Sequence, residues 1–206
     1  PCWYDPSTSG ICLTSANLGG ALMQAAELGS ANLVGAKMQR ANLTDANLDS
    51  ANLRGAQLFQ AALVRANLRA TNLRDASFFK SNLAGANLLG ADLRNARLLQ
   101  ANLAGANLEL ANLAMVDLQA AHSIEGIYLH RAILDRTGIT REQLGDAIGE
   151  ELDQEWFKAK ETYLALKVNF EQMGRYDDAS WAYRKERQME KRETWKKARE
   201  ALGEHH

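Results

Sequence analysis

A five-residue period governs most of this chain. Pentads of the form Ala-Asn-Leu-x-x begin at residues 16, 31, 41 and 106, and the phase is unbroken from residue 16 to residue 120. Residues 11–15 extend the phase one pentad earlier. The first position is Ala and the third is Leu, with the exceptions Met23, Met38, Phe78, Thr71, Ser81 and Val116. Such regularity indicates a single repeat architecture.

A period of five matches neither the 3.6-residue period of a helix nor the two-residue period of a strand. A coil that turns a corner every five residues keeps the small first residue and the large third residue pointing inward. Gly, Ser, Asp and Asn gather at the fourth and fifth positions, where the turns are needed. Each coil would then satisfy its backbone groups against its neighbours, so both ends of the array need caps.

The pentads resemble the pentapeptide-repeat family, whose motif is A(N/D)LXX, over about residues 11–135. The resemblance implies a β solenoid, a right-handed quadrilateral β-helix with four pentads per coil. About 22 pentads would give about 5.5 coils and a length of about 26 Å. Beyond Val116 the phase decays: it places Ser123 at a core position and recovers in part at Tyr128 and Ile133. The fold alone does not define a function.

Four pentads per coil stack residues 20 apart on one face. On one face this brings a row of asparagines into register, which we interpret as a structural hydrogen-bonded ladder: Asn47, Asn67, Asn87 and Asn107.

A second face breaks the motif. Its second position holds Lys37, Gln57, Ser77 and Arg97, and its last position holds Arg40, Gln60, Lys80 and Gln100. Between them, Phe59, Phe79 and Leu99 form an exposed apolar stripe about 10 Å long. We call these three residues the apolar stripe. A contiguous apolar patch with a polar rim usually marks a contact surface. The chain's own helical tail, an external partner or a second copy could cover it, or it could be bare.

The neighbouring face stacks Arg54, Arg74 and Arg94, the arginine row, at one residue per coil. Cations about 5 Å apart repel each other, so the row is either well solvated or directed at an acidic partner. Asp75 and Asp92 lie nearby and could neutralise part of the charge.

The charge of the repeat region bears on one known role of the family. Some pentapeptide-repeat proteins protect DNA gyrase by imitating duplex DNA, which requires a strongly acidic rod. Residues 11–135 carry ten Lys/Arg and nine Asp/Glu, and the whole chain has a net charge of −1. The near-neutral rod makes gyrase protection an alternative only. Nucleic-acid contact through the arginine row and a basic helix is a further alternative.

The last third of the chain reads as helical. A capping box at Thr140 and Gln143 predicts a short helix ending near Gly149. A second helix is expected from about residue 151 to Gly174, and a third from about residue 177 to residue 202. The segment resembles a single tetratricopeptide-type hairpin, on Gly174, Tyr176, Ala179 and Tyr183. Similar helical tails occur in some bacterial, especially cyanobacterial, members of the pentapeptide-repeat family.

A lone hairpin cannot bury its own faces, so it should pack on the solenoid's end or side, or pair with another copy. Eight Lys/Arg and three Glu between Arg184 and Arg199 favour a solvated helix over a phosphate-binding one. Trp181, Met189 and Trp195 could still form a hydrophobic strip for association.

We therefore divide the chain into an N-terminal lead or cap at residues 1–10, the β-helix at 11–135 and a helical region at 136–206. Cys2 and Cys12 could pair in an oxidising compartment or stay reduced, and two cysteines do not decide between these cases. A cytoplasmic location is favoured, and no apolar run is long enough to span a membrane.

Sequence motifs for catalysis are missing. There is no P-loop, CxxC, HExxH or nucleophile elbow, and His122 and His130 have no matched carboxylate for a metal site. We predict a non-enzymatic scaffold without cofactor, metal or small-molecule substrate, which binds a protein partner or forms a homo-oligomer. The candidate partner-binding residues are Phe59, Phe79, Leu99, Lys37, Arg97, Arg54, Arg74, Arg94, Trp181 and Trp195.

Overall fold

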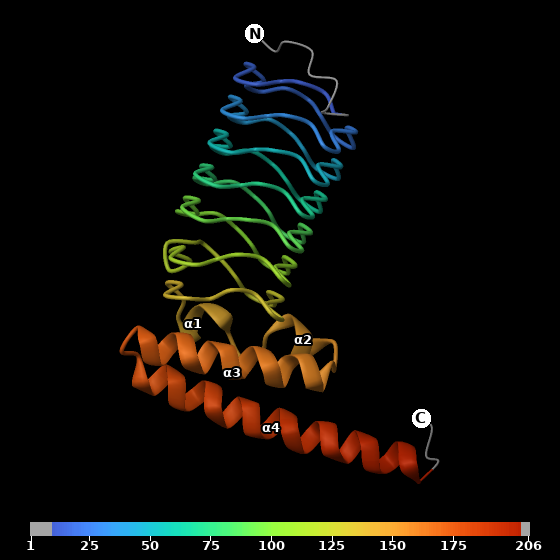
Figure 1. Ribbon diagram of the computed structural model, residues 1–206, viewed down its shortest axis with the longest axis vertical. Helices are drawn as coiled ribbons and strands as arrows, with labels where there is room; N and C mark the ends of the chain where they lie inside the picture. Colours follow the sequence, from blue (N-terminus) through green and yellow to red (C-terminus); the bar gives the residue numbers. More distant parts are fainter. Residues whose placement is uncertain (1–9, 203–206) are drawn as a thin grey trace.

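A computed structural model describes residues 10–202 and shows a β-solenoid with helices stacked under one end (Figure 1). Each pentad contributes one bridged residue, paired in parallel with a residue of the next coil. The pairs are 20 residues apart, from Cys12–Asn32 to Asp92–Asn112. Four pentads therefore complete one coil, and the predicted β solenoid with its C-terminal helical hairpin is confirmed.

Hydrogen bonds run up and down between successive coils. The N–H of Leu53 donates to the carbonyl of Asn72 at 2.8 Å, and the N–H of Asn72 donates back to Ala51 at 3.0 Å. The inward Ala and Leu side chains are almost fully buried from Leu28 to Leu118. Small first residues and large third residues thus fill the interior, as the period predicts.

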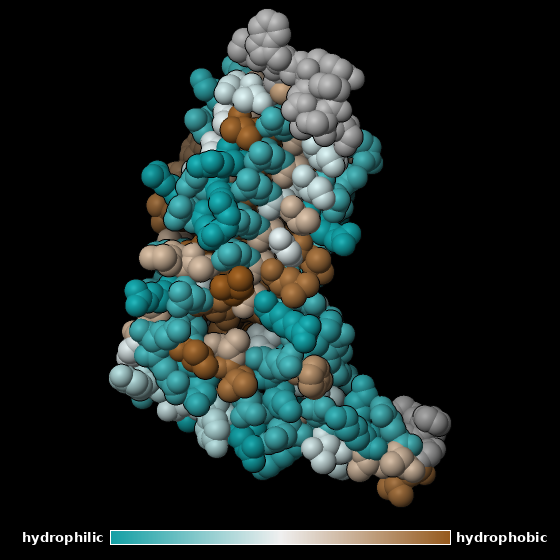
Figure 2. All heavy atoms as spheres, in the orientation of Figure 1, coloured by the Kyte–Doolittle hydropathy of each residue, from teal (hydrophilic) through white to brown (hydrophobic). Residues whose placement is uncertain are grey.

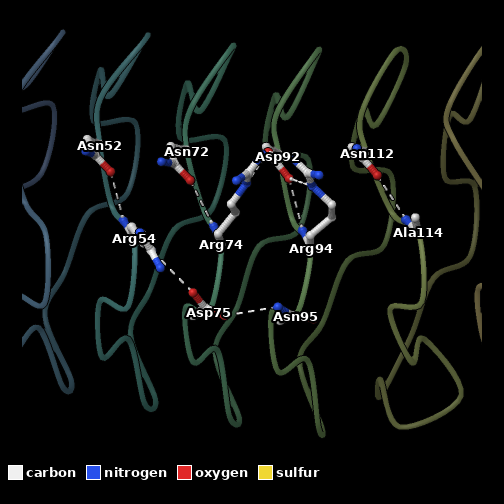
Figure 3. A network of polar contacts seen from close by, with 10 residues as sticks. All are labelled: Asn52, Arg54, Asn72, Arg74, Asp75, Asp92, Arg94, Asn95, Asn112 and Ala114. Carbon is white, nitrogen blue, oxygen red and sulfur yellow. Dashed lines mark hydrogen bonds and ion pairs between the residues drawn. The ribbon is translucent and has the colours of Figure 1, made fainter.

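The corners explain the polar residues of the motif. Figure 3 shows Asn52, Asn72 and Asn112 each accepting a hydrogen bond from the backbone N–H two residues later, at 3.1–3.2 Å. Such side-chain bonds close the turn locally. The fifth residue of most pentads then takes a left-handed conformation, with φ of 57° at Arg40 and 58° at Gln100.

One extra residue shifts the register after Leu118. Bridges later than this point join residues 21 apart, as in Asn107–Tyr128 and Asn112–Ile133. The expectation that Ser123 lies in the core and that Tyr128 and Ile133 return to it is therefore wrong. Those three residues face outward, and the core positions fall one residue later, at Ile124, Leu129, Leu134 and Ile139. The last bridged residue is Gly138, three residues past the expected boundary at 135.

Up to residue 202, four helices follow the solenoid: α1 (Arg141–Leu144), α2 (Gly149–Leu152), α3 (Trp156–Gln172) and α4 (Tyr176–Ala201). The first two lie against the last coil, α3 lies across the solenoid's end, and α4 forms the outermost layer antiparallel to α3 (Figure 1). The short helix expected from Thr140 to Gly149 is thus two separate turns, because Gly145 adopts φ 68° between them. Gly174, at φ 71°, ends the α3 segment as predicted.

The predicted capping box forms only in part. Thr140 accepts from the N–H of Gln143 at 3.3 Å. The Gln143 side chain does not return to Thr140 and instead donates to the carbonyl of Leu118 at 2.8 Å. The cap thereby ties α1 to the solenoid.

No helix between residues 10 and 202 is long and apolar enough to cross a membrane. Cys2 and most of the expected 1–10 lead lie outside the described residues, so the pairing of Cys2 with Cys12 stays a prediction.

Candidate interaction surface

The apolar stripe forms on the side of the solenoid as the 20-residue stacking predicts. The rings of Phe59 and Phe79 are stacked, with centroids 5.4 Å apart and 18° between their planes. Both rings are half-buried, while Leu99 in the next coil is 50% exposed. The stripe ends in polar residues, because Gln39 and Gln119 occupy the same column in the flanking coils.

Cations and amides border the stripe on both sides. The Lys80 ammonium lies 5.2 Å from the centre of the Phe79 ring. Arg40 donates to Gln60 at 3.0 Å, and Lys37 and Arg97 are exposed on the opposite border. The four pentads of this face, at 36–40, 56–60, 76–80 and 96–100, contain no Asp or Glu.

The helical tail does not cover the stripe. The helices lie under the last coil (Figure 1), whereas the stripe runs along the side of the rod. Within the described part of the chain, hydrogen bonds and ion pairs from the helices reach the solenoid only from Glu109 onward. The described helices therefore leave the stripe accessible to a partner.

The three cations of the arginine row are paired with two carboxylates. Figure 3 shows Arg54 bound to Asp75 at 3.3 Å and Arg74 bound to Asp92 at 2.6 Å. The same Asp92 also pairs with Arg94 at 2.8 Å. These pairs are partly exposed and contribute little stability, but they reduce the charge that the row presents. The expected proximity of the two aspartates is confirmed, and a role of the row in partner binding stays a prediction.

The hydrophobic strip expected on the last helix is not formed. Trp181 is 6% exposed and packs edge-on against Tyr163 of α3, with ring centroids 5.5 Å apart. Met189 is fully buried. Both residues belong to the α3–α4 interface, so the assignment of Trp181 to a partner surface is corrected.

Trp195 remains accessible, at 64% exposed. Arg192 lies over the ring of Trp156 near the start of α3, and α4 continues past that point. This end of α4 projects from the rest of the molecule in Figure 1, and Figure 2 shows a hollow between it and the solenoid.

The junction between solenoid and tail contains polar residues that sequence reasoning did not single out. The Asn169 side chain of α3 accepts from the Thr137 N–H and donates to the Thr137 carbonyl, both at 3.0 Å. The Asn169 amide thus makes the two backbone hydrogen bonds that Thr137 would otherwise make with a further coil. Glu150 accepts from the Leu129 N–H at 2.7 Å, and burial raises the pKa of this carboxyl.

His130 also belongs to this junction. Its Nε2 lies 2.8 Å from a carboxylate oxygen of Glu161, and its Nδ1 lies 3.9 Å from Glu109. The absence of a matched carboxylate expected from the sequence is therefore wrong, because the fold brings in residues from α3 and the preceding coil. Among residues 10–202, no three His, Cys, Asp or Glu side chains group in a way that could hold a metal ion.

The asparagine ladder is partly hydrogen-bonded. Asn67 donates to the side chain of Asn47 at 3.0 Å, and Asn47 donates to Glu27 at 2.8 Å. Asn87 and Asn107 accept from the N–H groups of their own turns at 3.2 and 2.9 Å. The row therefore stabilises turns as well as the stack.

Comparison with known proteins points to one family. A family model described as Pentapeptide repeats matches the chain in 8 copies, over residues 11–49, 26–63, 51–88, 61–98, 76–114 and 86–122. No match was found among curated proteins.

Solved structures with similarity to the chain include two from cyanobacteria. HetL, a pentapeptide repeat protein involved in heterocyst differentiation regulation in Nostoc sp. strain PCC 7120, is 30% identical, with 63% of this chain and 72% of HetL covered and a TM-score of 0.32. The pentapeptide repeat protein Rfr23 of Cyanothece 51142 is 34% identical, covering 51% of this chain and 60% of Rfr23, with a TM-score of 0.30. QnrB1, a plasmid-mediated fluoroquinolone resistance protein, is 17% identical, covering 64% and 75%, with a TM-score of 0.33.

Proposed function

The chain belongs to the pentapeptide-repeat family, and on this basis we propose that it is a non-enzymatic protein–protein interaction scaffold. The apolar stripe is its docking surface, and the helical tail caps the solenoid and offers a second surface. The carrying observation is that the stacked rings of Phe59 and Phe79 remain partly exposed on a rod whose motif does not require them. At the same position, other faces carry Asp49, Arg69 or Ala84.

A contiguous apolar patch with a polar rim usually marks a contact surface, and aromatic residues are enriched at the centres of protein interfaces. The polar border of amides and cations supplies the rim that such interfaces have. The solenoid backbone holds the stripe rigidly, so binding would order few groups.

The test is a double variant, Phe59→Ser with Phe79→Ser, used as bait beside the unaltered protein in extract of the native organism. We expect the variant to keep the solenoid fold, measured by circular dichroism and thermal unfolding, and to lose the captured partner. Leu89→Ser is the matched control, because Leu89 holds the same pentad position on another face. This control should retain capture.

Two outcomes would overturn the proposal. If the double variant unfolds, the stripe is packed structure and not a docking surface. If it folds and captures the same proteins as before, the docking surface lies elsewhere.

Protection of DNA gyrase by DNA mimicry is the alternative function. The rod has no acidic row to imitate phosphates, and its arginine row consumes two of the available carboxylates, Asp75 and Asp92. A supercoiling assay discriminates the two functions, because we expect gyrase activity to be unaltered across a titration of the protein. Nucleic-acid contact through the arginine row and α4 would be revealed by binding that weakens steeply with salt.

Association of two copies through the tail or a solenoid end is compatible with the scaffold. We expect the exposed Trp195, at the projecting end of α4, to contribute to this association. Light scattering of the unaltered protein and of Trp195→Ala measures it.

A further inference from the structure

We infer that the apolar stripe binds an acidic amphipathic helix of a different protein. The inference rests on the proposed function and names the chemistry of the partner. Two properties of the stripe support it, the charge of its border and the spacing of its apolar side chains. The composition of the chain's own helices supports it as well.

The border gathers, on one face of the solenoid, four cations without an ion-pair partner in the described chain. On other faces, Arg54 pairs with Asp75, Arg65 pairs with Asp45, and Arg74 and Arg94 share Asp92. By contrast, the four border cations form no ion pair with any carboxylate of residues 10–202. These cations are Lys37, Arg40, Lys80 and Arg97. An acidic partner would complement this face, and complementary charge raises both specificity and the rate of association.

The cations lie on both sides of the stripe. Lys37 and Arg97 occupy the second position of their pentads, before the stripe, and Arg40 and Lys80 occupy the last position, after it. A ligand seated on the stripe therefore meets positive charge along both edges. This arrangement suits an apolar strip that has carboxylates on each border.

The spacing of the stripe selects a helix over a strand. Stacked coils place successive stripe residues about 4.8 Å apart, so three of them span about 10 Å. Helix positions i, i+3 and i+7 lie on one face and span about 10.5 Å at a rise of 1.5 Å per residue. Same-face residues of an extended strand recur every 6.6–6.8 Å or so and would span about 13 Å, which loses register with the rings.

The chain's own helices do not supply this ligand. In α3, three Lys stand against two Glu, and in α4 eight Lys/Arg stand against six Asp/Glu. The other two, α1 and α2, have 4 residues each and are too short to cover the stripe. The described helices of a second copy would thus bring positive charge to a positive face, which leaves a different protein as the partner.

The test uses synthetic helical peptides as probes, with binding to the whole chain measured by fluorescence anisotropy. One peptide carries Leu at i, i+3 and i+7 with Glu on both borders, and a second carries Lys in place of Glu. We expect the acidic peptide to bind and the basic one not to. The triple variant Lys37→Gln, Lys80→Gln, Arg97→Gln should weaken acidic-peptide binding about tenfold, as for the loss of three exposed charge pairs.

The matched control is Arg54→Gln, Arg74→Gln, Arg94→Gln, which changes the net charge equally but removes cations that are already paired. We expect it to bind the acidic peptide within about twofold of the unaltered protein. Equal weakening by both triple variants would show a general charge effect and overturn the inference. Equal binding of the two peptides, or tighter and more salt-sensitive binding of a single-stranded oligonucleotide, would also overturn it.

The two proposals fail in different ways. If Phe59→Ser with Phe79→Ser abolishes capture of the native partner while neither peptide binds, the scaffold function stands and the acidic helix is wrong. If that variant captures normally, both are wrong.

Discussion

The carboxylate of Glu150 in α2 accepts a hydrogen bond from the backbone N–H of Leu129 in the last coil, at 2.7 Å. The same oxygen accepts from the Thr162 hydroxyl of α3 at 3.1 Å. Glu150 is fully buried, and its other oxygen has no hydrogen-bond partner within the described chain. One carboxyl group therefore joins the solenoid, α2 and α3.

Glu150 should make the junction sensitive to pH. Burial raises its pKa, although hydrogen bonds from Leu129 and Thr162 oppose the shift. Because the folded-state pKa lies above the unfolded one, this group favours the fold below its ordinary pKa and loses that contribution as the pH rises through the raised value. Glu150→Gln keeps an acceptor oxygen without a charge, so we expect it to remove this dependence and to equal or exceed the stability of the unaltered protein at neutral pH.

Glu150→Ala is the informative contrast. It leaves the Leu129 N–H and the Thr162 hydroxyl without their acceptor, which should lower the free energy of unfolding by about 2 kcal/mol. Tryptophan fluorescence during urea unfolding measures this, since Trp156 and Trp181 report on the tail. A Gln variant less stable than the Ala variant would contradict our assignment of the hydrogen bonds.

Asn169 should be the most sensitive residue of the cap. Its amide replaces a neighbouring strand for Thr137, and both residues are buried. Asn169→Ala leaves two buried backbone groups unpaired, and we expect a loss of about 3 kcal/mol in chemical denaturation.

Asn82→Ala is the matched control for Asn169. Asn82 is exposed and accepts only from the N–H of its own turn at 3.1 Å, and the preceding coil already has Ala62 at this position. The control should cost under about 1 kcal/mol. Equal losses in the two variants would show that Asn169 is not a special cap.

The five-residue period predicts the coil, the core and the column of the apolar stripe, because residues 20 apart must stack once each coil contains four pentads. The register shift was missed although Ile124, Leu129 and Leu134 keep a spacing of five, since they stand one residue out of phase with Leu118. Counting five residues on from Leu118 gives Ser123, a polar residue at an expected core position. This suggests that the repeat pattern ends, whereas in fact one residue is inserted.

The junction was not predictable from local patterns. Pairs such as Asn169 with Thr137 and His130 with Glu161 join residues more than 30 positions apart, and no spacing in the sequence predicts these contacts. Trp181 was misassigned for a related reason. A tryptophan on a strongly basic helix resembles a surface residue until the orientation of α4 on α3 is known.

Ala70 and Gly90 occupy the same corner one coil apart and provide an internal test of the turn conformation. Ala70 has φ 52° and Gly90 has φ 68°, both left-handed. A Cβ on Gly90 would meet nothing within 4 Å, so Gly90→Ala has only a conformational cost, about 1 kcal/mol. Ala70→Gly should stabilise by about 0.5 kcal/mol, since glycine tolerates this region but gains freedom when unfolded. Thermal unfolding measures both, and shifts of the same sign would refute the explanation.

Tyr128 should reveal how the tail responds to alkali. Its hydroxyl donates to Asp153 at 2.7 Å, and this hydrogen bond, with some burial, raises the pKa of Tyr128 to about 12. A raised pKa means that the contact stabilises the fold below the ordinary value of 10.0 and that this stability is lost as the pH rises towards about 12.

The difference in tyrosinate absorbance between the unaltered protein and Tyr128→Phe isolates the titration of Tyr128. We expect that difference to titrate well above the ordinary value, and the Asp153→Asn variant to shift it down. A difference that titrates at the ordinary value would mean that Tyr128 is not bound to Asp153 in solution.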